Sequence, residues 1–345
     1  MSRALPQLPG YEIQSRLGEG AGATISLGIE KATLKRVAIK QVIGDDPEAE
    51  KFVQQAENEY EIAHKINHPV LRKYYDIVRI KKWFKTREVF LIMEYVDGVR
   101  LEDQIPERLE DAIRIFIEVA EGLHAMHTAG FVHADIKPNN IMLCPAGRVK
   151  IIDFGQSCPL GHQKERIQGT PDYMAPEQIN RHPLDHRTDI FNLGCTMYQV
   201  FTGKYFTTLM SVAEPGTPKQ QLDSTRASEP PHELNDKLPL ALSKLIMECC
   251  ETAPTDRPRD MRLVISRLQT ALHAIETRGE KPAKRPRRDS GAGGGGAGGA
   301  STSSGANIAT VSAAGAPGDD GGEDDSFWSD LGLELDSEHG SLESS

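Results

Sequence analysis

Between residues 11 and 95, apolar and polar side chains alternate in short runs, which is the pattern of half-buried β-strands. A stretch of helical periodicity interrupts these runs over residues 47–66. The first part of the chain is therefore predicted to be a small antiparallel sheet accompanied by one helix. The runs predict strands at Tyr11–Leu17, Thr24–Glu30, Arg36–Ile43, Tyr74–Lys81 and Glu88–Tyr95.

Beyond residue 100 the apolar positions recur at helical spacing, most clearly in Glu110–His127 and Pro239–Glu251. We therefore expect an α+β, bilobal domain over residues 11–275. Its sheet-rich N-terminal lobe would cover about 11–95 and its larger helical C-terminal lobe about 97–275. Ligands commonly bind where two such lobes meet. The hydrophobic fraction of 38% and the charged fraction of 26% fit a folded protein.

The composition changes abruptly near the C-terminus, and residues 276–345 are predicted to be a disordered tail. The tail contains a basic cluster at 281–288, a glycine-rich stretch at 291–300 and an acidic end at 319–345. That acidic end carries ten Asp and Glu residues and no Lys or Arg, so the formal net charge of −10 leaves the rest of the chain neutral. Without an overall basic field, nucleic acid is not expected as the main partner.

The cellular setting is predicted from features that the chain lacks. Residues 1–10 form a short N-terminal extension without the apolar core of a signal peptide, and no run is apolar and long enough to cross a membrane. The cysteines show no metal-ligand spacing and are typical of reduced thiols. We expect a cytoplasmic protein without membrane association. The cysteines are Cys144, Cys158, Cys195, Cys249 and Cys250.

A glycine-rich segment joins the first two predicted strands. Glycine lets a turn fold closely over phosphates and present backbone N–H groups to them. Because a strand and not a helix follows, the segment differs from the dinucleotide-binding fingerprint. On its own, a plain glycine-rich hairpin is the simpler interpretation. The segment consists of Leu17, Gly18, Glu19, Gly20, Ala21, Gly22, Ala23, Thr24 and Ile25.

Two charged residues are predicted to face apolar surroundings. Strand alternation puts Lys40 on the same side as Ala38 and Val42. A buried carboxylate is costly unless it is paired, so we expect Lys40 to form an ion pair with Glu59. From these residues alone, the ion pair could serve the structure or bind a phosphate. Glu59 lies in the middle of the apolar stripe predicted for the helix at 47–66, which comprises Phe52, Ala56, Ile62, Ala63 and Ile66.

The stretch over residues 133–155 concentrates groups that are suited to phosphoryl transfer. Asp135 can accept a hydrogen bond from a substrate hydroxyl and take its proton, and Lys137 can neutralise charge on a phosphoryl group. Asn140 offers an amide oxygen and Asp153 a carboxylate, both hard ligands suited to Mg²⁺. Taken singly, each residue is more simply explained as part of a loop. Their order along the chain, after the predicted ion pair, favours one shared site.

Together these motifs resemble the eukaryotic-type Ser/Thr protein kinase family over about residues 11–270. The resemblance implies the bilobal kinase fold and transfer of the γ-phosphoryl group of Mg-ATP to Ser/Thr hydroxyls of protein substrates. Lys137 and the GTPDYMAPE form are typical of the Ser/Thr branch. The shared motifs are the glycine-rich loop at 18–25, VAIK at 37–40, Glu59, MEYV at 93–96, HADIKPNN at 133–140, DFG at 153–155, GTPDYMAPE at 169–177, Asp189 and Arg257.

The resemblance also implies roles for individual residues. Asp135, Lys137, Asn140 and Lys40 would be catalytic, and Asn140 and Asp153 would bind the metal. ATP would lie under the glycine-rich loop, with its phosphates held by Lys40 and Glu59 and its adenine bonded to backbone groups of Glu94 and Val96. Met93 would be the gatekeeper, and Arg257 would pair with Glu177. The base would lie between Ile25, Ala38 and Met142.

The chain departs from the family pattern at a regulatory position. Ala134 replaces the arginine that, in many kinases, binds a phosphate on the activation loop. Between Pro159 and Gly169 there is also no Ser, Thr or Tyr to carry such a phosphate. We therefore predict that activity does not require activation-loop phosphorylation. Two smaller departures are Ala23, expected to weaken closure over phosphate modestly, and Ala63, expected to leave the glutamate helix more mobile.

The sequence does not exclude other functions. A pseudokinase-like scaffold would use the same fold and the tail for binding only, and a small-molecule phosphotransferase would share the cleft. Within the tail, residues 323–335 set large apolar side chains among acidic ones, which is typical of a segment that docks on a partner. A solvated tail without a binding role is the alternative there.

Overall fold

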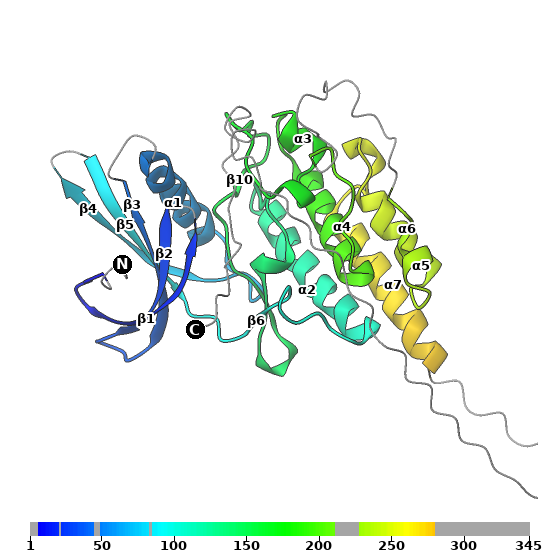
Figure 1. Cartoon of the computed structure of the whole chain (residues 1–345), viewed down its shortest axis with the longest axis horizontal. Coiled ribbons are helices and arrows are strands. Elements are labelled where there is room, and N and C mark those ends of the chain that lie inside the picture. The colour runs from blue at the N-terminus through cyan, green and yellow to red at the C-terminus, as the bar shows by residue number, and fades with distance from the viewer. Residues whose placement is uncertain (1–5, 21, 45–48, 83–84, 211–227, 280–345) are drawn as a thin grey trace, which may run out of the picture.

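The computed structural model describes residues 6–20, 22–44, 49–82, 85–210 and 228–279. Within these ranges the chain forms two lobes, a sheet with one helix and a larger helical part (Figure 1). The predicted α+β, bilobal architecture is therefore confirmed. The predictions for Ala21 and for the tail beyond residue 279, including its disorder and the docking segment at 323–335, lie outside the described residues.

The N-terminal lobe is built on a five-stranded antiparallel sheet with the strand order β1-β2-β3-β5-β4. The helix α1 (Ala49–His64) packs on one face of this sheet, against β3, β4 and β5. Two strands extend three residues beyond the predicted bounds, since β1 continues to Gly20 and β5 begins at Lys85. The strands are β1 (Tyr11–Gly20), β2 (Ala23–Glu30), β3 (Arg36–Ile43), β4 (Tyr74–Lys82) and β5 (Lys85–Glu94).

The alternation within β3 separates two apolar clusters, as predicted. Ala38 and Val42 belong to the main core, which continues through α1 into the C-terminal lobe. Val37 and Ile39 lie on the opposite face, in a smaller cluster that includes Leu8. Lys40 is thereby directed to the face that carries the helix and the cleft.

The C-terminal lobe is a set of packed helices. The longest, α2, contacts α7 and α4, and α4 contacts α6. Asp185 caps the start of α4 by accepting a hydrogen bond from Arg187 N at 2.7 Å, and Gly203 ends the helix with a φ of 71°. The helices are α2 (Leu109–Thr128), α3 (Pro176–Ile179), α4 (His186–Thr202), α5 (Pro231–Leu234), α6 (Leu240–Cys249) and α7 (Met261–Gly279).

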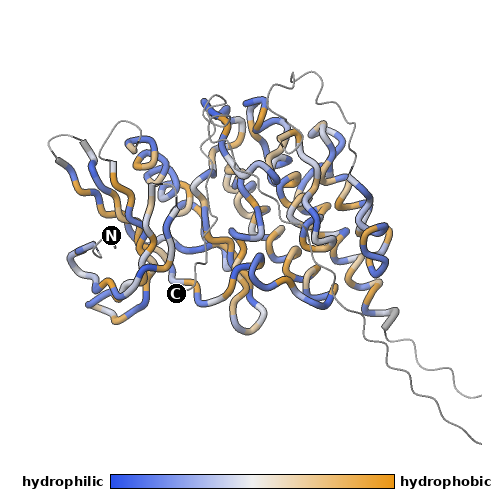
Figure 2. Tube along the Cα trace, in the orientation of Figure 1, coloured by the Kyte–Doolittle hydropathy of each residue, from blue (hydrophilic) through white to orange (hydrophobic). Residues whose placement is uncertain are grey.

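Hydrophobic and hydrophilic positions are interspersed along most of these elements (Figure 2), as expected where one side of an element is buried and the other exposed. Among the described ranges, none of the helices combines the length and hydrophobicity of a bilayer-crossing segment.

Short strands hold the catalytic stretch beside the cleft. One small sheet has the order β6-β8-β9, and a second pairs β10 with β7. A parallel bridge between Leu71 and Ile151 joins the first of these sheets to the segment that leads into β4. These short strands are β6 (Val99–Arg100), β7 (Phe131–Val132), β8 (Ile141–Leu143), β9 (Val149–Ile151) and β10 (Cys158–Pro159).

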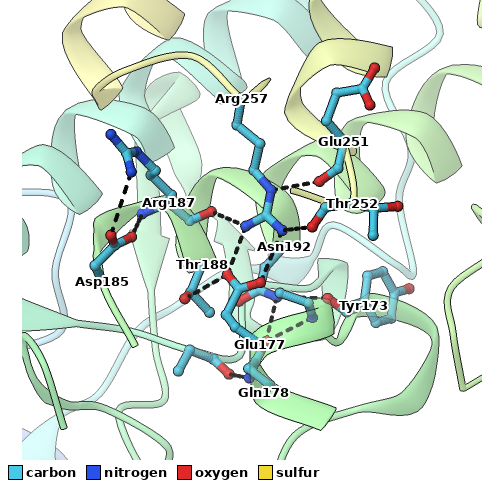
Figure 3. Close-up of polar contacts among 12 residues, drawn as sticks. Tyr173, Glu177, Gln178, Asp185, Arg187, Thr188, Asn192, Glu251, Thr252 and Arg257 are labelled. Carbon is cyan, nitrogen blue, oxygen red and sulfur yellow. Dashed lines mark hydrogen bonds and ion pairs between the residues drawn. The ribbon is translucent and has the colours of Figure 1, made fainter. Parts of the chain in front are cut away.

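A buried arginine ties the helices of the C-terminal lobe together (Figure 3). Arg257 is 4% exposed, and its two terminal nitrogens donate to the two carboxylate oxygens of Glu177 at 2.7 and 2.9 Å. It also donates to the carbonyl oxygens of Arg187, Glu251 and Thr252. The pairing of Arg257 with Glu177 that the resemblance implied is therefore confirmed.

Candidate active site

The predicted ion pair between β3 and α1 is present. Lys40 Nζ donates to Glu59 Oε2 at 2.9 Å and lies 3.8 Å from Asp153 Oδ1. Burial alone would lower the pKa of Lys40, but the carboxylates of Glu59 and Asp153 raise it above its usual value. Lys40 therefore carries a fixed positive charge between the sheet, the helix and the segment that contains Asp153.

The helix buries a slightly different stripe from the predicted one. Val53, rather than Phe52, is fully buried, and Ile66 lies beyond the helix end at His64. Phe52 is half-buried and contacts Gly22, where an added Cβ would lie 2.5 Å from the Phe52 ring. Gly22 also has a φ of 68°, so both its backbone conformation and this contact require glycine. Phe52 thus supports the glycine-rich turn.

Tyr74 makes a second contact to Glu59 that the sequence did not indicate. Its hydroxyl donates to Glu59 Oε1, and its ring lies 5.7 Å from the Phe154 ring. Burial and the neighbouring carboxylate raise the pKa of the Tyr74 hydroxyl well above its usual value, so it stays a donor. Tyr74 shares the main core with Ala63, and its larger side chain adds bulk to that part of the core.

Replacing Tyr74 with phenylalanine is expected to lower kcat/KM about tenfold, because a hydrogen bond to a charged group contributes about 1.5–3 kcal/mol. Steady-state kinetics at saturating magnesium would measure this. Tyr75→Phe is the matched control, since the Tyr75 hydroxyl accepts from Lys35 Nζ away from Glu59. Equal kinetics for the two variants would contradict the role of Tyr74.

Asp135 lies at the centre of a network of side chains that face the cleft. Its Oδ1 accepts hydrogen bonds from Thr170 Oγ1 at 3.0 Å and from Thr170 N at 3.2 Å. Lys137 Nζ lies 3.5 Å from Asp135 Oδ2 and donates to Thr170 Oγ1 at 2.7 Å. Asn140 Nδ2 donates to Asp135 Oδ2 at 3.1 Å. Three predicted residues are therefore brought together, with Thr170 as a fourth member.

Asp189 fixes the backbone in front of Asp135. Its carboxylate accepts hydrogen bonds from the backbone N–H groups of His133 at 2.8 Å and Ala134 at 2.7 Å, and it lies 2.8 Å from His127 Nε2. Burial alone would raise the pKa of Asp189, but the contacts with His127 and His133 lower it. The carboxylate is therefore ionised and holds Ala134 in a left-handed backbone conformation, with a φ of 62°.

Asp153 and Asn140 fit the requirements of a magnesium site. Desolvation alone would raise the pKa of Asp153, but Lys40 and the Gly155 N–H bring it down to about 2, so the carboxylate is ionised. Asn140 uses its Nδ2 on Asp135, which leaves its amide oxygen as the available acceptor. One carboxylate with one amide oxygen suits Mg²⁺, which takes its other ligands from water and substrate phosphates.

The cleft contains most of the predicted site. Predicted residues that line it are Gly18, Glu19, Gly20, Ala23, Ile25, Lys40, Glu59, Met93, Asp135, Lys137, Asn140 and Asp153. Others lie next to these in sheet register or sequence: Ala38 pairs with Met93, Thr24 with Glu19 and Met142 with Arg100, while Leu17, Gly22 and Glu94 are chain neighbours of the lining. Val96 lies three positions after Met93 and is not part of the lining.

Several lining residues were not predicted. Arg72 donates from Nη1 to the carbonyl oxygen of Ile152 at 3.0 Å, and its Nε is buried without a partner among the described residues. It lies in a short connection without periodicity, so no pattern points to it. Asn139 and Gly155 belong to the quoted motifs but were given no role of their own, and the further unpredicted lining residues are Gln55, Arg100, Ile152 and Gln156.

Comparison with known proteins gives the family. The family model for the protein kinase domain matches residues 11–268. A probable serine/threonine-protein kinase of Clostridium acetobutylicum is 30% identical over 269 residues, covering 75% of this chain and 39% of that protein.

The serine/threonine-protein kinase PknB of Mycobacterium tuberculosis is 30% identical over 204 residues, covering 56% of this chain and 32% of that protein. A probable PknB of Corynebacterium glutamicum is 32% identical over 208 residues, covering 56% of this chain and 31% of that protein. The chain thus spans less than two-fifths of the length of these relatives. By the match over residues 11–268 and the assembled cleft, this chain belongs to the protein kinase family, and the relatives named above are bacterial proteins named as Ser/Thr kinases.

Proposed function

We propose that this chain is an active Ser/Thr protein kinase that transfers the γ-phosphoryl group of Mg-ATP to protein hydroxyls. The observation that carries the proposal is the joint placement of Asp135, Lys137 and Thr170 opposite the Lys40–Glu59 pair. Protein kinases use ATP and Mg²⁺, and they catalyse mainly by positioning and electrostatics. Each group needed for this is present in the cleft.

Each of these side chains has a separate role in the reaction. Asp135 accepts the hydrogen bond of the substrate hydroxyl and takes its proton late in the transfer, while Lys137, beside it, stabilises charge on the phosphoryl group. Lys40 holds the other phosphates, with Glu59 keeping its ammonium in place. Asp153 and Asn140 would hold Mg²⁺, which would supply positive charge to neutralise the phosphates.

We further propose that this activity does not depend on phosphorylation of the activation segment, residues 156–173. The only hydroxyl side chains in that range are Ser157, Thr170 and Tyr173. In the structure each of these hydroxyls donates a hydrogen bond: Ser157 to the His133 carbonyl oxygen, Thr170 to Asp135, and Tyr173 to Gln199. Phosphorylating any of them would break a contact that already orders the site.

Other contacts support the segment without a phosphate. Arg181 Nη1 donates to the Glu165 carbonyl oxygen at 2.8 Å, and Gln163 Nε2 donates to the Arg181 carbonyl oxygen at 2.7 Å. Leu184 exchanges backbone hydrogen bonds with the same stretch, accepting from Gly161 N at 2.7 Å and donating to the His162 carbonyl oxygen at 2.9 Å. A phosphate-binding arginine at residue 134 is therefore unnecessary for ordering this segment.

Phosphatase treatment is expected to change the kinase activity by no more than about threefold, because ordering does not use a phosphate. Activity on a generic protein substrate would be measured before and after treatment, with mass spectrometry of residues 156–173. A loss greater than about tenfold that maps to Ser157, Thr170 or Tyr173 would refute this independence.

A role as a pseudokinase-like scaffold is the competing function. It would be favoured if the wild-type chain transferred no phosphoryl group to any substrate tested. The cytoplasmic location and the docking partner of residues 323–335 stay predictions from the sequence. Recovery of the same partners by the full chain and by a version truncated after residue 289 would count against the docking role.

A further inference from the structure

The activation segment contains a buried lysine that neither the catalytic machinery nor the substrate-binding groups use. Lys164 is 9% exposed although it lies in a loop. Its Nζ donates to the Gln156 carbonyl oxygen at 2.8 Å and to Gln156 Oε1 at 2.9 Å. A buried ammonium is costly unless it is paired or well bonded, so this contact needs an explanation.

The partner of Lys164 belongs to the turn that carries the metal ligand. Gln156 follows Asp153, Phe154 and Gly155 directly and lines the cleft. Within this turn, Gly155 N donates to Asp153 Oδ1 at 2.9 Å, and Ser157 N donates to the Phe154 carbonyl oxygen at 2.9 Å. The Lys164 ammonium lies outside this turn and binds Gln156, the residue that follows Gly155.

The charges around Lys164 explain how an ammonium is tolerated there. Burial lowers the pKa of Lys164 below its usual value, and the nearby Cys158, Asp135 and Asp189 offset only part of this. Asp135 is the neighbour of Ala134 in sequence, and Asp189 binds the Ala134 N–H. Lys164 thus supplies a positive charge close to the carboxylates on both sides of Ala134, whose own side chain offers none.

We propose that Lys164 is a positioning residue that holds the Asp153–Ser157 turn in its catalytic conformation from within the activation segment. This inference rests on the proposed kinase activity and extends it. Through its two hydrogen bonds to Gln156, Lys164 links the activation segment to the turn that carries the proposed metal ligand Asp153. This contact needs no phosphorylation, because Lys164 and Gln156 are both part of the unmodified chain.

The test compares Lys164→Met with Lys164→Arg and with Lys204→Met, in the full chain. Methionine keeps the volume but removes the charge and the donors, arginine keeps both, and Lys204 is an exposed lysine paired with Glu229. We expect Lys164→Met to lower kcat at least about tenfold and to raise the Mg²⁺ concentration for half-maximal rate severalfold. We expect Lys164→Arg to recover most of this loss and Lys204→Met to match wild type.

Hydrogen exchange gives a readout that does not depend on turnover. Lys164→Met should lose protection in residues 153–170 and keep it in α2 and α4, with little change in Tm. A Gln156→Leu variant, which keeps the carbonyl but loses Oε1, should add little to the effect of Lys164→Met in the double variant. Additive effects, or loss of protection throughout the domain, would contradict a positioning role.

The outcomes separate this inference from the proposed function. If dephosphorylated wild type is active and Lys164→Met is equally active at the same Mg²⁺ concentration, the role of Lys164 is refuted and the kinase proposal stands. If wild type transfers no phosphoryl group, the kinase proposal fails, and a changed exchange pattern in Lys164→Met would then report only a structural contact.

Discussion

Replacing Asp135 with asparagine is expected to lower kcat by about 10²–10⁴-fold, because the variant loses the group that takes the substrate proton. Asparagine keeps an oxygen that can accept from Thr170, so this contact and the fold should persist, while the hydrogen bond from Asn140 Nδ2 is lost. ATP binding should also persist, since Lys40, Glu59 and Asp153 do not contact the substituted atom. Single-turnover transfer and nucleotide binding by calorimetry would measure the two effects separately.

Asp236→Asn is the control for this experiment, since Asp236 is exposed in the C-terminal lobe. The control should retain wild-type turnover and Tm. Retention of more than about a tenth of wild-type kcat by Asp135→Asn would exclude Asp135 as the base. A pronounced fall in its Tm would instead show that the carboxylate contributes mainly to structure.

Replacing Arg257 with methionine is expected to reduce the free energy of unfolding by about 3–5 kcal/mol, because Glu177 would keep a buried charge without its partner. The expected fall in Tm is on the order of 10 °C. Removing the guanidinium also frees the carbonyl oxygens of Arg187, Glu251 and Thr252 from their shared donor (Figure 3). Differential scanning calorimetry would measure the change.

Two further variants make this prediction specific. Arg259→Met removes an arginine whose side chain is 80% exposed, and it should leave Tm nearly unchanged. The double variant Glu177→Gln with Arg257→Met has no uncompensated buried charge, so it should be more stable than Arg257→Met alone. If the double variant were less stable than the single one, burial of an unpaired charge would not be the cause.

The sequence predicted contacts whose partners both lie on regular elements. Strand alternation puts Lys40 on one face of β3, helical periodicity puts Glu59 on the inner side of α1, and the cost of burying either charge pairs them. Helical periodicity wrongly predicts that Phe52 is buried in place of its neighbour Val53. Phe52 instead lies against Gly22 of the glycine-rich turn, a contact that periodicity does not include.

Contacts made by loop residues could not be predicted from the sequence. Thr170 reaches Asp135 across 35 positions, and Asp189 reaches Ala134 across 55, through backbone N–H groups that have no sequence signature. The short segment that contains Lys164 has no periodicity to show that its lysine turns inward. Tyr74 is predicted only as a strand residue, and its hydrogen bond to Glu59 joins the start of β4 to α1, which the strand pattern does not indicate.

The guanidinium of Arg72 has a consequence for inhibitors of this protein. It lines the same cleft as Met93, and its Nε is buried without a hydrogen-bond partner among the described residues. A compound that extends into this part of the cleft with a carboxylate or an ionised sulfonamide would therefore be attracted by the positive charge of the Arg72 guanidinium. The same acidic group would lose affinity for kinases that present an apolar side chain at the corresponding point, which makes Arg72 a basis for selectivity.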